Sequence, residues 1–180
     1  MRGLGRRRVY NAGMKTFLVP VDFSADTDQV IESAIALTRA FGGRATLLHV
    51  VQAPIVATAE FALPVEAMQE AITASQKAAR EKLVRYTERF RRAGLDCTFQ
   101  LHVGSPVALI LEEAAKSSAD FIVMGSHGHG KLYDLLVGST ASGVIKKAKC
   151  GVIILPPEEK HQLGGHAIRG SVGEPAFPGR

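Results

Sequence analysis

Several features common in membrane, secreted and zinc-binding proteins are missing from this chain of 180 residues. No apolar run approaches the ~20 residues of a membrane-spanning helix, so we expect a soluble protein with no membrane partner. Cysteine occurs only at Cys97 and Cys150, without CxxC spacing. This scarcity excludes a disulfide framework and a cysteine-based zinc site. We expect a cytoplasmic protein in which both thiols are small buried side chains.

The chain also has little excess charge once its two ends are set aside. The net charge of +5 comes mainly from residues 1–13, which hold four arginines and no acidic residue. Residues 158–180 are balanced, so about +1 remains for residues 14–157. A basic face for nucleic acid is therefore not predicted.

Composition predicts one domain with an extension at each end. Residues 1–13 are rich in Arg and Gly and lack apolar periodicity, which predicts a disordered extension. Residues 158–180 are rich in Gly and Pro and predict a flexible tail. We expect a single α/β domain over residues 14–157, with Met14 as the physiological start because the first strand pattern begins there.

Short apolar segments alternate with longer stretches of helical periodicity. The expected strands cover residues 17–21, 45–51, 97–103, 121–124 and 152–155, and the expected helices cover residues 25–41, 64–93, 106–116 and 139–147. Strands separated by helices predict a doubly wound five-stranded parallel sheet with helices on both faces. Nearly all-apolar strands agree with a sheet that is covered on both sides. The charged stripe of the second helix is interpreted as a solvated face.

The segment after the fourth expected strand carries the pattern G-x2-G-x9-G-S. Gly125 and Gly128 lie in a loop, and Gly138, Ser139 and Thr140 open the next helix. Glycine lets the backbone approach a ligand closely, and hydroxyls at a helix start can donate to an anion. With the N–H groups of the helix start, this grouping predicts a nucleotide phosphate site.

Two other interpretations of this segment fail on residue type. The run from Gly125 to Lys131 reads G-x4-G-K, but Leu132 follows where a P-loop uses Ser or Thr for magnesium. His127 and His129 have no cysteine or carboxylate at ligand spacing. We therefore assign no catalytic residue and no metal ligand.

The ends of the first two strands add candidates for a ligand site. In open parallel sheets, ligands bind beyond the carboxyl ends of the strands, where the strand order reverses. Strand one ends at Pro20, Val21 and Asp22, and strand two ends at His49 and Val50. Asp22 could accept hydrogen bonds from an adenine amino group or a ribose hydroxyl, and Val50 could cover the base. The alternative role of Asp22 is to cap or brace the following helix.

These residues resemble the universal stress protein family over residues 14–156. The resemblance rests on Pro-Val-Asp-Phe-Ser at 20–24, on Leu-His-Val at 48–50 and on the glycine pattern. That pattern matches every position of the family's nucleotide-binding motif, G-x2-G-x9-G-[ST]. The resemblance implies a Rossmann-like fold of the adenine nucleotide alpha hydrolase-like type.

The resemblance further implies a site for ATP, ADP or AMP, which Mg²⁺ or Mn²⁺ could join through the phosphates. The implied contacts are Pro20, Val21, Asp22 and Val50 for adenosine, Met124 and Gly125 near the ribose, and Gly128, Gly138, Ser139, Thr140 and Ala141 for the phosphates. Where ATP-binding members have Thr, this chain has Val21, so contact there would come from the backbone.

The function implied by the resemblance is nucleotide-dependent regulation or signalling in a stress response. The motif supplies backbone donors and hydroxyls rather than a positioned base, so slow ATP hydrolysis is the most that we expect. The resemblance also implies a homodimer through the last strand, residues 152–155, and an apolar edge strand benefits from such pairing.

Three other functions compete with this one. A nucleotide-free dimeric protein-interaction module stays open as the alternative. An adenylate-forming enzyme would need a Gly-rich loop after strand one, and residues 22–26 contain no glycine. A phosphoacceptor of the response-regulator type would need an acid at the end of strand three, where residues 101–103 read Leu-His-Val.

Overall fold

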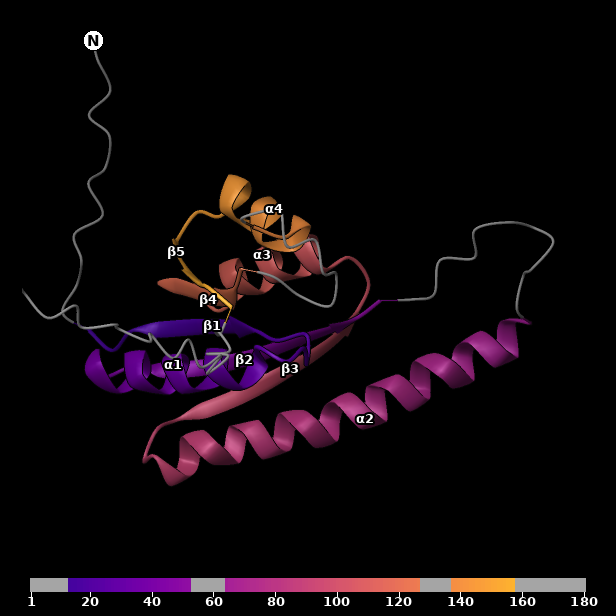
Figure 1. Ribbon diagram of the computed structural model, residues 1–180, viewed down its shortest axis with the longest axis horizontal. Coiled ribbons are helices and arrows are strands. Elements are labelled where there is room, and N and C mark those ends of the chain that lie inside the picture. Colours follow the sequence, from indigo (N-terminus) through magenta and orange to yellow (C-terminus); the bar gives the residue numbers. More distant parts are fainter. Residues whose placement is uncertain (1–12, 53–63, 127–136, 158–180) are drawn as a thin grey trace, which may run out of the picture.

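A computed structural model of the protein describes residues 13–52, 64–126 and 137–157. Strands and helices alternate along these residues (Figure 1). The elements in chain order are β1 (Thr16–Pro20), α1 (Thr27–Ala40), β2 (Arg44–Val51), α2 (Val65–Arg92), β3 (Cys97–Val103), α3 (Pro106–Lys116), β4 (Phe121–Gly125), α4 (Ser139–Lys147) and β5 (Gly151–Leu155).

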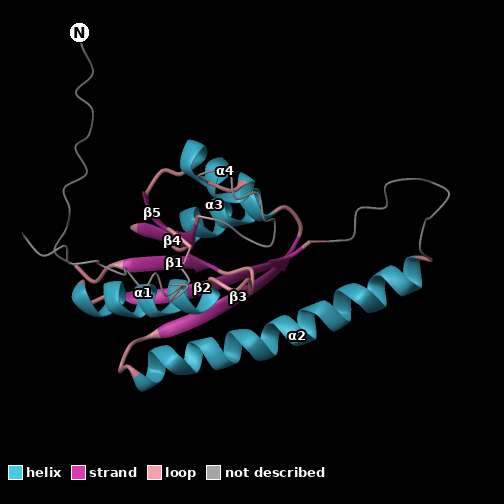
Figure 2. Cartoon of the chain, in the orientation of Figure 1, coloured by secondary structure: helices cyan, strands magenta, loops and turns pink. Residues whose placement is uncertain are grey.

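The strands form one parallel sheet in the order β3-β2-β1-β4-β5. The chain runs outward from β1 to β3 on one side and then returns to β4 and β5 on the other side (Figure 2). The strand order therefore reverses between β1 and β4. The predicted five-stranded parallel α/β sheet is confirmed.

Helices cover both faces of the sheet, as expected. α1 and α2 lie on one face, and α3 and α4 lie on the other (Figure 1). Side chains of β1 alternate between these layers, because successive residues of a strand point to opposite faces. Phe17 and Val19 join the core under α1 and α2, whereas Leu18 joins the core under α3 and α4.

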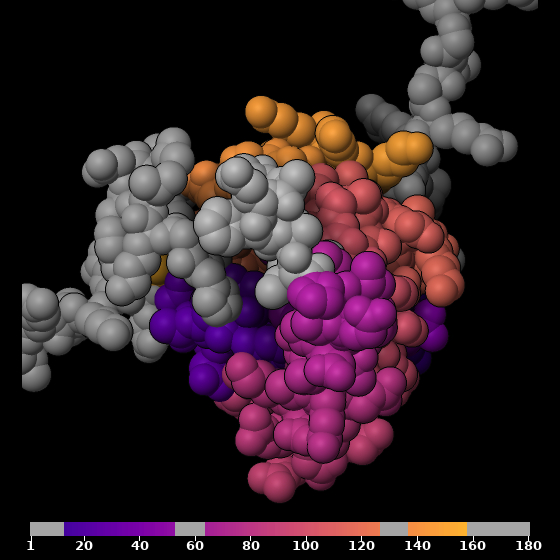
Figure 3. All heavy atoms as spheres, turned by 90° about the vertical axis from the view of Figure 1, so that its right-hand side faces the viewer, coloured from indigo at the N-terminus to yellow at the C-terminus, as the bar shows by residue number. Residues whose placement is uncertain are grey.

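Only part of the long helix α2 packs against the sheet. Its buried residues are Ala79, Leu83, Thr87 and Phe90, all in the second half of the helix. The first half projects beyond the sheet in Figure 1 and stands toward the viewer in Figure 3. The helix therefore gains its packing from its C-terminal half, on β2 and β3.

One residue of the charged face of α2, Arg89, also pairs with α1. Its guanidinium group donates hydrogen bonds to the carboxylates of Asp28 and Glu32 on α1. α1 and α2 lie side by side on the same face of the sheet, so Arg89 connects the two helices. The sequence pattern contained no sign of this pairing, because the partners are far apart along the chain.

Glycines follow the ends of the first two helices. Gly42 follows α1 with a φ of 60°, and Gly94 follows α2 with a φ of 74°. Both values lie in the left-handed region that glycine adopts without a steric penalty. These turns lead the chain into β2 and β3.

Neither Cys97 nor Cys150 is assigned to a disulfide bond. Cys97 is buried in the core at the start of β3, as expected, and burial raises the pKa of its thiol to about 12. A thiol with this pKa is protonated at neutral pH and is a poor nucleophile. Cys150 is only half-buried. In the part of the chain that the structure describes, no helix has the length and apolar character needed to cross a membrane.

Candidate functional site

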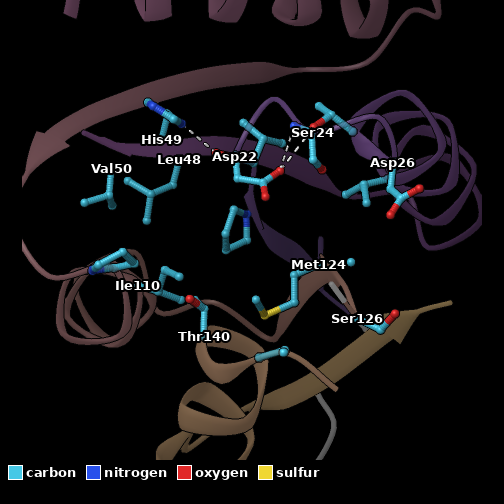
Figure 4. Close-up of a pocket in the computed structure, with 18 of the residues that line it drawn as sticks. Asp22, Ser24, Asp26, Leu48, His49, Val50, Ile110, Met124, Ser126 and Thr140 are labelled. Atoms are coloured by element: carbon cyan, nitrogen blue, oxygen red, sulfur yellow. Dashed lines mark hydrogen bonds between the residues drawn. The ribbon is translucent and has the colours of Figure 1, made fainter. Parts of the chain in front are cut away.

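A cavity of about 420 Å³ opens at the carboxyl ends of β1, β2 and β4. It lies where the strand order reverses, which is the usual ligand position in open parallel sheets. The starts of α1, α3 and α4 contribute the remaining walls (Figure 4). We call this cavity the switch-point pocket.

The switch-point pocket brings together almost all the residues that the sequence nominated. The nominated residues on its walls are Pro20, Val21, Asp22, Val50, Met124, Gly125, Gly138, Ser139, Thr140 and Ala141. Gly128, His127 and His129 lie outside the described residues. The nominated residues come from three strand ends and one helix start, so the fold alone brings them together.

One part of the pocket is apolar. Leu48 and Val50 come from β2, Met124 comes from β4, and Ile110 comes from α3. Their side chains surround the pocket in Figure 4, with Thr140 lying beside Ile110. Such a surface suits a flat, weakly polar group such as a nucleobase.

Asp22 marks a polar wall opposite α4. Its Oδ1 accepts a hydrogen bond of 3.0 Å from the Ser24 N–H and one of 3.4 Å from the Thr27 hydroxyl at the start of α1. Asp22 therefore braces the turn into α1, as one of the two interpretations of this residue required. The residue is also exposed and lines the pocket, so recognition of a ligand by the same carboxylate is compatible with bracing.

Substitutions of Asp22 can separate its role in bracing the turn into α1 from a role in binding a ligand. Asp22→Asn keeps an oxygen for the Ser24 N–H but presents a donor where an adenine amino group would need an acceptor. We expect about 10-fold weaker adenosine-nucleotide binding with nearly unchanged thermal stability. Asp22→Ala removes the brace as well and is expected to cost about 1 kcal/mol of stability.

Calorimetric binding and thermal unfolding of both variants check this prediction. Unchanged binding by Asp22→Asn would leave Asp22 with the bracing role alone.

His49 is a pocket residue whose role the sequence did not reveal. Its Nδ1 lies 2.7 Å from the Val21 carbonyl oxygen. A carbonyl oxygen can only accept, so Nδ1 carries the proton in this contact. The Val21 N–H in turn donates to the Leu48 carbonyl oxygen at 2.8 Å. Both the N–H and the carbonyl oxygen of Val21 are thus engaged by residues of β2.

The start of α4 faces the apolar part of the pocket. The first N–H groups of any helix have no acceptor within the helix, and in α4 they belong to the residues that begin at Ser139. The first turn of α4 holds no acidic residue, and Lys146 and Lys147 lie in its last turn. The helix dipole therefore keeps its positive end at the pocket, where it favours an anion.

The two flanks of the glycine loop are joined by backbone hydrogen bonds. The Gly138 N–H donates to the Ser126 carbonyl oxygen at 2.7 Å, and the Ser126 N–H donates to the Leu155 carbonyl oxygen at 2.8 Å. These bonds fix the start of α4 against the ends of β4 and β5. The anion-favouring end of α4 is therefore held in place by the sheet.

Several further pocket residues escaped the sequence analysis. They are Ser24, Asp26, Thr27 and Val30 near α1, Leu48 and Gln52 on β2 and after it, and Pro106, Ile110 and Ser126. Pro106 and Ile110 of α3 follow β3, whereas the glycine motif follows β4. The packing of α3 beside α4 brings these two residues to the pocket. The described residues contain no group of three or more His, Cys, Asp or Glu side chains placed to hold a metal ion.

The fold and the pocket together define the class of this protein: an open parallel α/β protein with a ligand pocket at the reversal of its strand order. Comparison with known proteins identifies the family. The model of the universal stress protein family matches residues 13–156, and the chain belongs to this family.

Individual relatives agree with the family assignment. Universal stress protein MJ0531 of Methanocaldococcus jannaschii is 30% identical over 148 residues, which cover 81% of this chain and 84% of the relative. Among solved structures, the hypothetical protein MJ0577 is 26% identical with a TM-score of 0.70, covering 80% of this chain and 96% of that one.

A second solved structure shares the fold and was obtained with a nucleotide. The universal stress protein of Archaeoglobus fulgidus, solved in complex with dAMP, is 24% identical with a TM-score of 0.54. The match covers 80% of this chain and 98% of that chain.

Proposed function

We propose that this universal stress protein binds an adenine nucleotide in the switch-point pocket and acts as a nucleotide-dependent regulator in a stress response. The main support for the proposal is that ten of the residues predicted from the sequence, the first being Pro20 and the last Ala141, line one cavity. That cavity has an apolar part, an exposed carboxylate at Asp22 and the positive end of α4. The base of a nucleotide suits the apolar part, its amino group or the ribose suits the carboxylate, and the phosphates suit the positive end of α4.

The polarity of the pocket supports one orientation of the nucleotide. The adenine would rest against Val50 with its amino group or the ribose toward Asp22, and the ribose would pass Met124 and Gly125. The phosphates would approach the N–H groups and hydroxyls at the start of α4, together with Gly128. Mg²⁺ or Mn²⁺ would join through the phosphates, since Mg²⁺ commonly binds with few protein ligands. The dAMP complex of the Archaeoglobus fulgidus relative supports an adenine nucleotide as the ligand class.

Regulation rather than catalysis suits the chemistry of the pocket. Phosphoryl transfer needs a positioned nucleophile and charge stabilisation over the transferring group. The end of the pocket at α4 is formed by Gly138, Ser139, Thr140 and Ala141, which offer N–H groups and hydroxyls. We therefore expect hydrolysis of ATP to be slow at most, so that the bound nucleotide acts as a signal.

We also propose a homodimer that pairs through β5. This strand lies at the edge of the sheet, and all five of its residues, Gly151–Leu155, are half-buried. An apolar edge strand is stabilised when a second strand pairs with it. Sedimentation analysis should give twice the mass of one chain, and a single species with the mass of one chain would contradict the dimer.

Calorimetric titration of the nucleotide-stripped protein tests the proposed function. ATP, ADP and AMP are titrated with and without magnesium. We expect micromolar binding, about −8 kcal/mol, with affinities that rank by phosphate number because α4 favours anions. Absence of heat and of any thermal shift with all three nucleotides would refute the proposal. It would favour the alternative, a nucleotide-free dimeric protein-interaction module.

A further inference from the structure

Phe23 has a backbone conformation that is costly for its residue type. It lies between Asp22 and Ser24, which both line the switch-point pocket, and its φ is 61°. A bulky residue in the left-handed region is strained by about 1–3 kcal/mol in general, so surrounding contacts must maintain it. Glycine would adopt the same φ without that cost. The aromatic ring therefore needs a compensating role.

Contacts from β2 and α2 hold the ring of Phe23. The His49 ring, at the end of β2, lies 4.3 Å away between centroids. The Tyr86 ring of α2 is nearly parallel with centroids 6.3 Å apart, and the Lys82 Nζ lies 4.8 Å from the centroid of the Phe23 ring. Stacked rings and a cation over an aromatic face are both attractive. We call these contacts the Phe23 clamp.

The Phe23 clamp restrains the segment that carries the polar wall of the pocket. His49, which contacts the ring, also holds the Val21 carbonyl oxygen through Nδ1. On the other side of Asp22, the Ser24 N–H donates to the Asp22 carboxylate (Figure 4). Residues 21–24 are therefore fixed at their backbone and at the ring of Phe23. Asp22 lies within this restrained segment.

We propose that Phe23 is a positioning residue of the nucleotide site, whose ring, clamped by His49, Tyr86 and Lys82, aims the Asp22 carboxylate into the pocket. This inference rests on the proposed nucleotide-binding function. It also connects α2 to the pocket, because two of the three clamp contacts come from that helix. Recognition of the adenosine part of the ligand is thus tied to the packing of α2.

Two substitutions at this position test the proposal. Phe23→Gly keeps the left-handed backbone without strain but removes the ring, whereas Phe23→Tyr keeps the ring as a matched control. We expect Phe23→Gly to weaken the binding of adenosine, AMP and ATP by the same factor, roughly 10-fold, because the preorganisation of Asp22 is lost. The ratio of ATP to AMP affinity should stay unchanged, because the phosphates lie at α4. Phe23→Tyr should bind within about twofold of the original protein.

A readout without ligand separates this proposal from the proposed function. The Ser24 N–H donates to Asp22, so its hydrogen exchange reports whether the carboxylate stays in place. We expect exchange to be about 10-fold faster in Phe23→Gly and unchanged in Phe23→Tyr. Unaltered exchange and unaltered affinities in Phe23→Gly would overturn the proposal. If the original protein bound no nucleotide, the proposed function would fail, and unchanged Ser24 exchange in Phe23→Gly would then still refute the aiming role of Phe23.

Discussion

Thr140→Glu is expected to lower the affinity for ATP by about 100-fold without destabilising the fold. Thr140 lies in the first turn of α4 and lines the switch-point pocket beside Ile110 (Figure 4). A carboxylate there would repel the phosphates that the pocket is proposed to hold. The same carboxylate interacts favourably with the helix dipole, so stability should be equal or higher. Calorimetry and thermal unfolding measure the two effects separately.

The dependence on phosphate number makes this prediction specific. The loss should be largest for ATP, smaller for AMP and absent for adenosine, because only phosphates approach α4 in the proposed orientation. Thr140→Ser retains the hydroxyl and serves as the matched control, with affinity close to that of the original protein. An equal loss for adenosine and ATP would mean that the base, rather than the phosphates, lies at the start of α4.

Phe90→Ala is expected to have the largest effect on stability, about 3–5 kcal/mol. Phe90 has no exposed surface and packs in the core that α2 forms with the sheet. Removal of the ring leaves a cavity between α2 and the strands β2 and β3. Chemical denaturation measures the loss as a change in the free energy of unfolding.

A second position on α2 provides the control for Phe90. Val84 is 50% exposed on the same helix, and Val84→Ala should change the stability by no more than about 0.5 kcal/mol. If Phe90→Ala cost less than about 1 kcal/mol, α2 would contribute little to the core. The connection between α2 and the pocket through Phe23 would then lose its structural basis.

The elements of the fold were accessible from the sequence because apolar periodicity and glycine positions are local signals. Residues 97–103 and 139–147 were predicted with the bounds that β3 and α4 have. Residues 106–116 likewise match α3, and the remaining elements shifted by one or two residues at their ends. The largest shift is at α1, which begins at Thr27 because the preceding residues form a turn around Asp22. Periodicity does not detect a turn of this kind.

The sequence predicted those residues of the site that lie at strand ends or in the glycine pattern. Strand ends and the glycine pattern nominated residues that the fold then placed around one cavity. Ile110 and the His49 contact to Val21 were missed because they depend on which elements become neighbours. The pairing of Arg89 with α1 and the strained backbone of Phe23 have the same origin. Such features arise from packing and have no local pattern.

An amide NMR titration of the nucleotide-stripped protein, first with AMP and then with ATP, tests the central claim most directly. The account predicts that AMP shifts the amides of Asp22, Val50 and Gly125, and that ATP adds large shifts at Ser139 and Thr140. Saturable shifts confined to a different surface, or a spectrum that neither nucleotide changes, would contradict binding in the switch-point pocket.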